Sequence, residues 1–371
     1  MKMSYKVCSR CVMDNRNNSI SFDDNGICNY CLDFDANKSF YRYNDKFPSK
    51  FYEIGNVLKS KGKNSKYDCI IGLSGGVDSS YVAYLAVKKL GLKPLAIHFD
   101  NGWNSDIAIK NVEAVVNSLK IDLETYIVDW EEFRDLQRAF LFASVIDIEM
   151  LSDHAIKAAN YQIARKYRIR YSLSGGNYVT EHGMPSGWYY TPKEDLRNIK
   201  DIAKKFGKVK LKSFPKLSLF KYKILSKSNL TYESIHLLDK MNYSRSEAIG
   251  VLEKELGWKN YGGKHHESFI TKFYQEYILP KKFNVDKRKV HLSALIRNEE
   301  MTREDAIVEL QTEINQTTME QDIKYFLKKM KLTTAEFETI MKASPKNHRE
   351  FKSDMDIIEK IRPLLAFKRR G

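Results

Sequence analysis

The chain lacks the features that mark membrane-spanning and secreted proteins. Its 371 residues contain no apolar run that approaches the length of a bilayer, and its first six residues include two lysines and no apolar signal segment. It also lacks internal repeats and low-complexity runs. We therefore expect a cytoplasmic protein of two or three globular domains, without a membrane span and with reduced cysteines.

Cysteine is scarce, and four of the five residues form one cluster. Two Cys-x2-Cys pairs are separated by sixteen residues, and their members are Cys8, Cys11, Cys28 and Cys31. Each pair directs two thiolates at one point, and four sulfur ligands leave no open position for catalysis. A disulfide framework and an iron–sulfur cluster are the alternatives, and a reducing compartment disfavours the first. The spacing predicts a structural Zn²⁺ site.

The fifth cysteine, Cys69, lies in an apolar run, and no cysteine follows it. We interpret it as a core residue, because free cysteine is often buried. A glutaminase domain needs a nucleophilic cysteine, so the chain has no plausible glutaminase of its own. Sulfur transfer through a persulfide or an iron–sulfur cluster is disfavoured for the same reason.

Positive charge is concentrated in one half of the chain. The formal net charge is +15, and nearly all of it lies from Arg197 onward. A basic half is compatible with RNA, a nucleotide-linked sugar, an acidic partner or an anionic membrane face. Lysines mixed with carboxylates on helix faces are equally typical of a plain solvated surface. Charge alone therefore selects no partner.

The most informative segment is residues 70–80, IIGLSGGVDSS, in which an apolar strand pattern leads through two glycines into a helix pattern. A helix N-terminus has unpaired N–H groups and binds anions, and glycine lets the backbone approach a phosphate closely. A tight, serine-capped turn is the purely structural alternative. The predicted cofactor-binding residues are Ser74, Gly75, Gly76, Val77, Asp78, Ser79 and Ser80, all of which except Val77 and Asp78 are expected to be phosphate ligands. Of these, Asp78 is expected to hold Mg²⁺, and Asp78 and Ser79 are the catalytic candidates. The Gly-x4-Gly-Lys-Ser/Thr pattern of kinase-type P-loops is absent.

Strand and helix patterns alternate around this motif. We predict strands at 67–73, 94–99, 123–128 and 171–173, and helices at 79–90, 107–119, 131–146 and 153–167. Such alternation indicates an α/β fold with a doubly wound, mostly parallel sheet. The predicted domains are a zinc ribbon at 1–45, an ATP-binding α/β domain at 46–195 and a basic, mainly helical region at 196–371 that binds substrate or partner.

Ligands in such sheets bind beyond the carboxyl ends of the strands. Polar residues and a glycine lie at the ends of two further predicted strands, with His98, Asp100 and Asn101 at one end and Gly175 and Asn177 at the other. Plain turns are the alternative at these positions.

Two later segments are also candidates for substrate binding. The loop that follows Asn177 is rich in polar, aromatic and glycine residues and contains Glu181 and His182. The basic half adds Lys264, His265, Glu267 and Arg288, although paired histidines are as often surface or core residues.

The residues Ser74 to Ser79 resemble the pyrophosphate loop, or PP-loop, of the ATP pyrophosphatases. Together with the four-cysteine ribbon, the loop after Asn177 and the segments around Glu267 and Arg288, they resemble the N-acetyl sugar amidotransferase family over nearly the whole chain. This resemblance implies that ATP transfers AMP to the acetamido oxygen of a nucleotide-activated sugar. Ammonia then displaces AMP and gives an acetamidino sugar for surface polysaccharide or flagellin glycans. Glu181 and His182 are the candidate bases.

The resemblance also implies partners. The family obtains ammonia from separate glutaminase and cyclase-like subunits that resemble those of imidazole glycerol phosphate synthase, and no nucleic acid is expected. The main alternative is a PP-loop enzyme that modifies tRNA. A non-catalytic adenylate-binding regulator with a zinc module is a third hypothesis, which the intact Asp78 and serine set disfavours.

Overall fold

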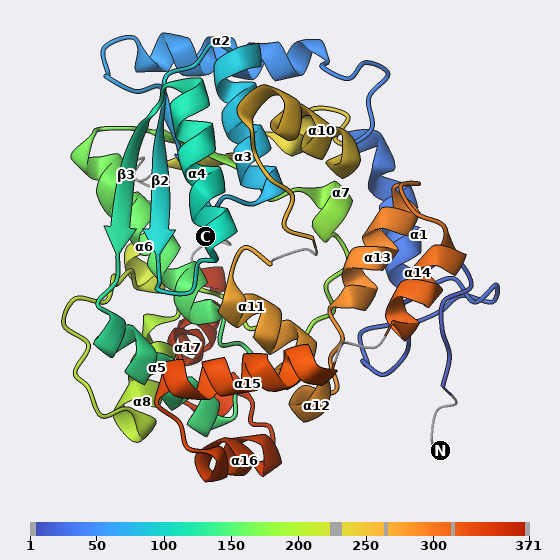
Figure 1. The fold of residues 1–371 in the computed structure, drawn as a ribbon, viewed down its shortest axis with the longest axis vertical. Helices are drawn as coiled ribbons and strands as arrows, with labels where there is room; N and C mark the ends of the chain where they lie inside the picture. Colours follow the sequence, from blue (N-terminus) through green and yellow to red (C-terminus); the bar gives the residue numbers. More distant parts are fainter. Residues whose placement is uncertain (1–4, 223–231, 263–265, 313–315, 368–371) are drawn as a thin grey trace.

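The computed structural model describes residues 5–222, 232–262, 266–312 and 316–367, with side chains as far as residue 360. Five strands form one parallel sheet in the order β3-β2-β1-β4-β5 (Figure 1). Their bounds are β1 Cys69–Gly72, β2 Pro94–Asp100, β3 Asp122–Ile127, β4 Tyr171–Ser174 and β5 Glu233–His236.

The strand order reverses between β1 and β4. The chain runs outward from β1 through β2 to β3 and then returns to place β4 on the other side of β1. In open parallel sheets such a switch point opens a crevice beyond the strand ends, because the two connections leave in opposite directions. The segment between β1 and helix α3 (Val77–Tyr84) lies at this point. The sheet therefore directs the Ser74–Ser79 loop at a binding crevice.

Alternate residues of the strands pack against helices on opposite faces of the sheet. Cys69 and Ile71 face a cluster built with α2 (Ser49–Gly62), α3, α4 (Asp106–Leu119) and α10 (Arg245–Leu256). Ile70 faces the other side, where α6 (Met150–Lys166) covers the sheet. Burial on both faces is typical of parallel sheets and explains why β1 is apolar throughout.

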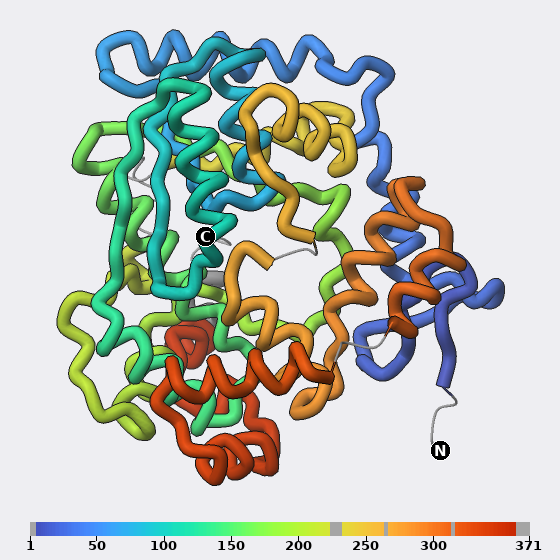
Figure 2. Tube along the Cα trace, viewed as in Figure 1, coloured from blue at the N-terminus to red at the C-terminus, as the bar shows by residue number. Residues whose placement is uncertain are grey.

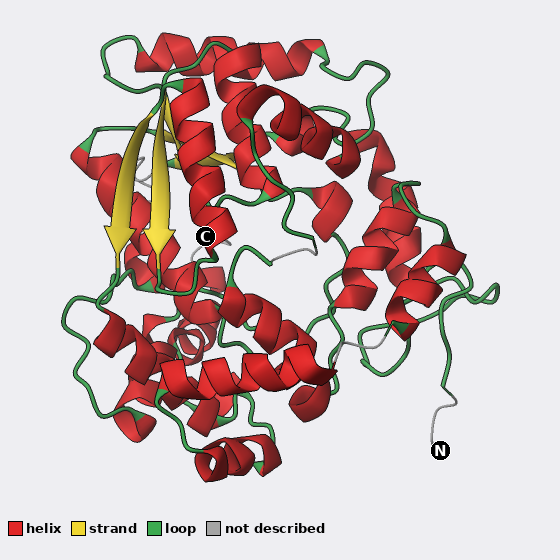
Figure 3. Cartoon of the chain, viewed as in Figure 1, coloured by secondary structure: helices red, strands yellow, loops and turns green. Residues whose placement is uncertain are grey.

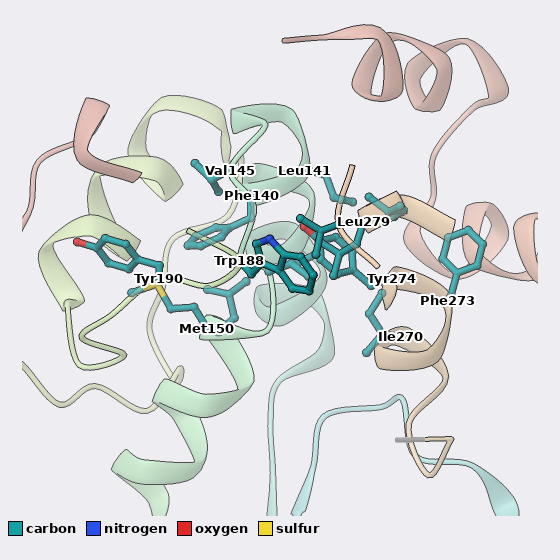
Figure 4. Packing of buried hydrophobic residues seen from close by; sticks show 14 of the residues in the cluster. Phe140, Leu141, Val145, Met150, Trp188, Tyr190, Ile270, Phe273, Tyr274 and Leu279 are labelled. Carbon is teal, nitrogen blue, oxygen red and sulfur yellow. The ribbon is translucent and has the colours of Figure 1, made fainter. Parts of the chain in front are cut away.

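A second, mainly helical part lies beyond the carboxyl ends of the strands. In Figure 1 the arrows of β2 and β3 point toward it, and Figure 3 shows helix throughout this half. Its helices are α5 Trp130–Ala143, α8 Leu196–Phe206, α11 Phe269–Phe273, α12 Leu279–Phe283, α15 Gln316–Met330, α16 Thr334–Lys342 and α17 Asp354–Phe367. They share an apolar core that includes Phe140, Trp188, Phe273 and Tyr274 (Figure 4). Among the described residues, no helix combines the length and hydropathy that a bilayer crossing needs.

The N-terminal segment packs against a helical pair from the basic half. Helix α1 (Asn29–Asn37) and the loops before it lie beside α13 (Arg288–Arg297) and α14 (Arg303–Gln311), seen as blue and orange tubes side by side in Figure 2. Short α7 (Tyr178–Glu181) contacts α13 from the nucleotide domain. The ribbon and the C-terminal region thus share an interface around the crevice.

The predicted fold class is confirmed, and the four predicted strands are present with ends shifted by at most two residues. The fifth strand, β5, falls inside the segment that we expected to be mainly helical. It is short and mostly exposed at the edge of the sheet, so it lacks the apolar run that marks a buried strand.

Candidate active site

The Ser74–Ser79 loop joins β1 to the N-terminus of α3. Gly75 has a φ of +82°, and a Cβ there would lie 2.3 Å from the carbonyl oxygen of Ala108. Only glycine fits this conformation and this approach. The carbonyl oxygen of Gly75 accepts hydrogen bonds from the Trp258 indole at 2.9 Å and from the Asn111 amide at 3.4 Å. The loop is therefore fixed from behind by α4 and by the segment after α10.

Hydroxyl and amide groups of the loop converge on the crevice. Ser74 Oγ lies 3.1 Å from Ser79 Oγ and accepts a hydrogen bond from the Gly76 amide at 3.2 Å. The Val77 amide donates to the Tyr261 hydroxyl at 3.3 Å. Both amides belong to the start of α3, whose helix dipole favours an anion. The Tyr261 hydroxyl therefore accepts from an amide that would bind a phosphate oxygen when a nucleotide is present.

The glycine turn after β4 packs directly on this helix start. A Cβ on Gly175 would lie 3.0 Å from the Ser79 amide nitrogen, so a larger residue would push the turn away from α3. The neighbouring Asn177 is 4% exposed and caps α7, with its side-chain oxygen accepting from the Thr180 amide at 2.8 Å. Gly175 therefore packs against the start of α3 beside the loop, whereas Asn177 shapes the chain behind it.

A pocket of about 220 Å³ surrounds the loop. Its lining residues are Ser74, Gly76, Val77, Asp78, Ser79, Gly175, Gly176, Glu181, Arg245, Tyr261 and Glu267. Three carboxylates face the same small space as the phosphate-binding groups, and ATP phosphates would repel them without a cation between. Carboxylate oxygens are the ligands that Mg²⁺ takes in phosphate sites. The donor set thus fits a nucleotide bound with Mg²⁺, with Asp78 as one ligand.

Asp78 is oriented by a buried tyrosine. The Tyr243 hydroxyl donates a hydrogen bond to Asp78 Oδ1. Burial raises the pKa of Tyr243 well above its ordinary value, and the Asp78 carboxylate raises it further, so the phenol keeps its proton. Tyr243 precedes α10 by two residues and carried no sequence signal of its own.

A second pocket of about 350 Å³ lies beyond the ends of β1 and β2 and shares Ser74 and Glu267 with the phosphate pocket. Its apolar walls are formed by Ile97, Phe99, Ile148, Ile156 and Ile270, and its polar groups include Asn101, Asn104, Gln137, Ser152 and Thr271. Apolar walls with a few amide and hydroxyl groups suit a nucleobase and ribose. We refer to it below as the nucleoside pocket.

Of the three candidates at the end of β2, only Asn101 lines this pocket. His98 is 8% exposed, and its ring nitrogens contact the Leu73 carbonyl oxygen at 2.9 Å and the Asn104 amide at 3.1 Å. Asp100 accepts from the Gly102 amide at 2.8 Å. His98 and Asp100 therefore shape the strand end instead of facing the nucleoside. Sequence position alone could not separate these roles, because all three residues lie at the end of the same strand.

A third pocket of about 370 Å³ opens on the other side of the phosphate pocket, and Arg245 lines both. Its other residues are Thr180, Gly262, His266, Lys272, Gln275, Glu276, Arg288, His291, Leu292, Leu295, Met301 and Glu309. The predicted Arg288 lies here, paired with Asp286 at 2.9 Å. Arg245, the link between the pockets, was missed in the sequence, where only the capping pattern of α10 was visible.

The remaining predicted residues separate into several groups. Glu267 lies between the phosphate and nucleoside pockets, and Glu181 lines the phosphate pocket. Lys264 and His265 lie outside the described residues. Ser80 is fully buried behind the loop, and its hydroxyl makes no hydrogen bond within the described part of the chain.

His182 does not line any of the three pockets. Its ring stacks on Tyr178 with centroids 4.1 Å apart, and its Nε2 lies 3.1 Å from Asp33 Oδ2. Burial lowers the pKa of His182, and the nearby Arg297 lowers it further. His182 therefore belongs to the contact between α7 and the ribbon.

The four ribbon cysteines are buried, and their sulfur atoms all lie within 4.8 Å of one another. Cys8 Sγ accepts hydrogen bonds from the amides of Cys11 at 3.4 Å and Cys28 at 3.2 Å. Amides directed at sulfur stabilise thiolates, and four convergent thiolates are the donor set of structural zinc. The predicted zinc ribbon is consistent with this cluster.

The ribbon is tied to α13 and α14. Lys289 of α13 forms a buried ion pair with Asp14, and Arg303 of α14 donates to the carbonyl oxygens of Cys8 and Cys11, each at 3.2 Å. The opposite side of α13 supplies Arg288, His291 and Leu292 to the third pocket. The cysteine cluster thus supports one wall of that pocket.

Two parts of the chain match known protein families. Residues 51–175 match the NAD synthase family, and residues 267–362 match the family described as LPS biosynthesis protein WbpG-like, C-terminal domain. An uncharacterized protein of Methanocaldococcus jannaschii is 30% identical over 118 residues, which are 31% of this chain. The chain spans only 40% of the length of that relative.

Two of the solved structures that resemble this chain have low sequence identity to it and low TM-scores. NMN synthetase from Francisella tularensis has 17% identity and a TM-score of 0.30, over 60% of this chain and 89% of that one. A predicted subunit of tRNA methyltransferase from Methanocaldococcus jannaschii has 16% identity and a TM-score of 0.29, over 50% of this chain and 74% of that one. The family matches carry more weight. The chain combines a PP-loop domain of the NAD synthase type with a WbpG-like C-terminal domain, which supports an ATP-utilising enzyme.

We predict that Gly75→Ala weakens ATP binding strongly. The new Cβ would meet the Ala108 carbonyl, and a positive φ in a non-glycine residue costs about 1–3 kcal/mol. We expect at least a tenfold rise in the dissociation constant for Mg-ATP in isothermal titration calorimetry. The matched control is Gly250→Ala, because a Cβ there meets nothing within 4 Å. Equal ATP affinity in the two variants would contradict the assigned role of the loop.

We also predict that removing zinc loosens α13 while leaving the nucleotide domain in place. Chelation should release one Zn²⁺ per chain and raise amide hydrogen exchange in α13 tenfold or more, because Asp14 and the Cys8 and Cys11 carbonyls then lose their fixed positions. Exchange in β1 and α3 should change less than twofold. A chain that binds no zinc, or equal loosening of α3 and α13, would refute this link.

Proposed function

We propose that this chain, which joins a PP-loop domain to a WbpG-like C-terminal domain, is an ATP-dependent amidotransferase acting on a nucleotide-activated N-acetyl sugar. It adenylates the acetamido oxygen and lets ammonia displace AMP, which gives an acetamidino sugar. The description of the C-terminal family supports a role in lipopolysaccharide biosynthesis, and flagellin glycans are the other product class.

The observation that carries the proposal is the arrangement of the three pockets. The nucleoside pocket joins the phosphate pocket through Ser74 and Glu267, and the phosphate pocket joins the third pocket through Arg245. An ATP molecule in the first two would direct its phosphate groups toward Arg245. We propose that the third pocket receives the acceptor, whose oxygen attacks the α-phosphorus. We call it the acceptor pocket.

The acceptor pocket suits an anionic sugar derivative. Arg245, Lys272 and Arg288 bring positive charge to it, while Leu292, Leu295 and Met301 supply an apolar surface. Guanidinium groups bind carboxylates and phosphates in two-point contacts, and the apolar side chains offer a surface to a methyl group or a sugar face. A sugar that carries an acetamido methyl and a carboxylate or phosphate presents both features.

The phosphate pocket serves the first step of the proposed reaction, the activation of the amide oxygen. An amide oxygen is a weak nucleophile and a poor leaving group, so it must be activated before ammonia can replace it. The oxygen attacks the α-phosphorus, and the bond to the pyrophosphate oxygen breaks. The Gly76 and Val77 amides, Ser74, Ser79 and Arg245 stabilise the charge that develops on the pyrophosphate. Mg²⁺ would supply further neutralisation there, held by Asp78.

Ammonia must come from elsewhere, and we propose separate glutaminase and cyclase-like subunits as its source. Cys69 is the only cysteine outside the ribbon, and it is fully buried in the core on β1. Burial raises the pKa of its thiol, so it does not ionise near neutral pH. It therefore offers no nucleophile for glutamine hydrolysis.

The test is mass spectrometry of sugar nucleotides incubated with the chain, Mg-ATP and ammonium chloride. A uridine-linked diacetamido uronic acid and a cytidine-linked nine-carbon acid are the two probes. We expect the mass change of replacing an amide oxygen by NH, together with AMP and pyrophosphate. Arg245→Met should lower this rate by about 10²-fold, the usual effect of losing a charge that faces the transition state. Arg42→Met, on the exposed residue paired with Glu299, is the matched control.

An exchange assay separates this function from its alternatives. Exchange of labelled pyrophosphate into ATP should depend on the acetamido sugar. Exchange that depends on tRNA instead would support a tRNA-modifying enzyme and overturn the proposal. No exchange with any acceptor, despite ATP binding, would favour a non-catalytic regulator.

A further inference from the structure

A histidine–glutamate pair lies on the wall of the acceptor pocket. His266 Nε2 is 2.8 Å from Glu276 Oε1, and both residues line the pocket. The two side chains are 29% and 18% exposed, so the pair is partly shielded from water. A carboxylate on one ring nitrogen fixes the ring orientation and stabilises the imidazolium that forms when the other nitrogen takes a proton.

The backbone around the pair places it between the pockets. His266 faces the acceptor pocket, while the next residue, Glu267, faces the phosphate and nucleoside pockets. The side chains of two consecutive residues thus line opposite sides of one wall. A group transferred from the phosphate pocket to the acceptor arrives beside His266.

Glu276 belongs to an unusual piece of helix. Residues Tyr274–Ile278 form a π-helical turn between α11 and α12, and this turn also directs Gln275 into the acceptor pocket. Single π-helical turns cost helix stability and are frequent at functional sites, because the extra residue redirects side chains. Glu276 also interacts electrostatically with Arg288 across the pocket. The turn therefore supplies the group that orients His266.

We propose that His266, oriented by Glu276, is the catalytic base that accepts a proton from the attacking ammonia. The inference rests on the proposed amidotransferase function and assigns its second step to named residues. Glu276 acts through the ring and is a positioning residue.

The step balances without a further reactant. Ammonia adds to the carbon of the adenylated imidate, and the carbon then bears an ammonio group, the sugar nitrogen and the oxygen linked to AMP. His266 takes one proton from the ammonio nitrogen. The carbon–oxygen bond breaks, AMP leaves with the bonding electron pair, and the remaining nitrogen lone pair completes the amidinium. The proton on His266 passes to solvent through the open side of the pocket.

Glu181 and His182, the candidate bases in the sequence, are less suitable for this role. The ring of His182 stacks on Tyr178 outside the three pockets. Glu181 lines the phosphate pocket, where the pyrophosphate leaves, and not the acceptor pocket. A base for ammonia is needed where the acceptor carbon lies.

The experiment compares adenylation with amidation in His266→Ala. Sugar-dependent pyrophosphate exchange should stay within about threefold of wild type, because His266 takes no part in the first step. Amidine formation with ammonium chloride should fall by about 10²-fold or more, the usual contribution of a general base. Water then hydrolyses the imidate, so AMP should exceed amidine, whereas wild type forms them in equal amounts. Added imidazole should restore amidation in His266→Ala.

Three further variants test the assignment of the base. Glu276→Gln keeps a hydrogen-bond acceptor and should lose about tenfold in amidation, with excess AMP but normal exchange. His182→Ala is the matched control and should keep AMP and amidine equal, whatever its stability. Equal amounts of AMP and amidine in His266→Ala would overturn the assignment of the base. An excess of AMP over amidine in Glu181→Gln, but not in His266→Ala, would overturn it as well. Absence of amidine from the wild-type chain would overturn the proposed function and the base assignment with it.

Discussion

The hydrogen bond from the Trp258 indole to the Gly75 carbonyl joins the two parts of the site. Gly75 fixes the loop that receives phosphate, and Trp258 begins the segment that leads to Tyr261, His266 and Glu267. The Asn111 amide donates to the same carbonyl, and the neighbouring amides of Gly76 and Val77 donate to Ser74 Oγ and to the Tyr261 hydroxyl. The buried contact at Trp258 therefore connects the loop to the wall of the other two pockets.

The distribution of charge follows from the reaction that we propose. Carboxylates of Asp78, Glu181 and Glu267 surround the phosphate pocket, where a cation must accompany the nucleotide. The acceptor pocket contains two arginines and a lysine against two carboxylates, Glu276 and Glu309, so positive charge is in excess where an anionic sugar would bind. Arg245 lines both the phosphate pocket and the acceptor pocket. The basic composition of the C-terminal half thus has at least one local purpose, which the net charge by itself could not reveal.

Much of the fold and part of the site could be predicted from sequence because their signals are local. The apolar strand before Ser74, the glycines after it and the paired cysteines are each contiguous patterns. The roles of Arg245, Tyr243 and His266 depend on long-range packing that brings α10 and the segment before α11 to the loop. The edge strand β5 also escaped prediction, because an exposed edge needs no apolar run. Among His98, Asp100 and Asn101, only the fold could decide which side chain turns toward the pocket.

The ribbon supports one wall of the acceptor pocket, although its cysteines do not line that pocket. Its cysteine carbonyls and Asp14 hold α13 and α14 from one side, and α13 presents Arg288 and His291 on the other. A closed four-thiolate site offers no catalytic position, so its contribution is geometric. The acceptor pocket is consequently a shared product of the N-terminal and C-terminal regions around the nucleotide domain.

In the reaction that we propose, ATP activates the acetamido oxygen. Labelling that oxygen with ¹⁸O and following the label through one reaction with ammonium chloride tests this step. We expect the ¹⁸O to leave the sugar and to appear in the phosphate of AMP, with none in pyrophosphate. Label found in inorganic phosphate or pyrophosphate, or AMP formed without label while the amidine accumulates, would contradict it.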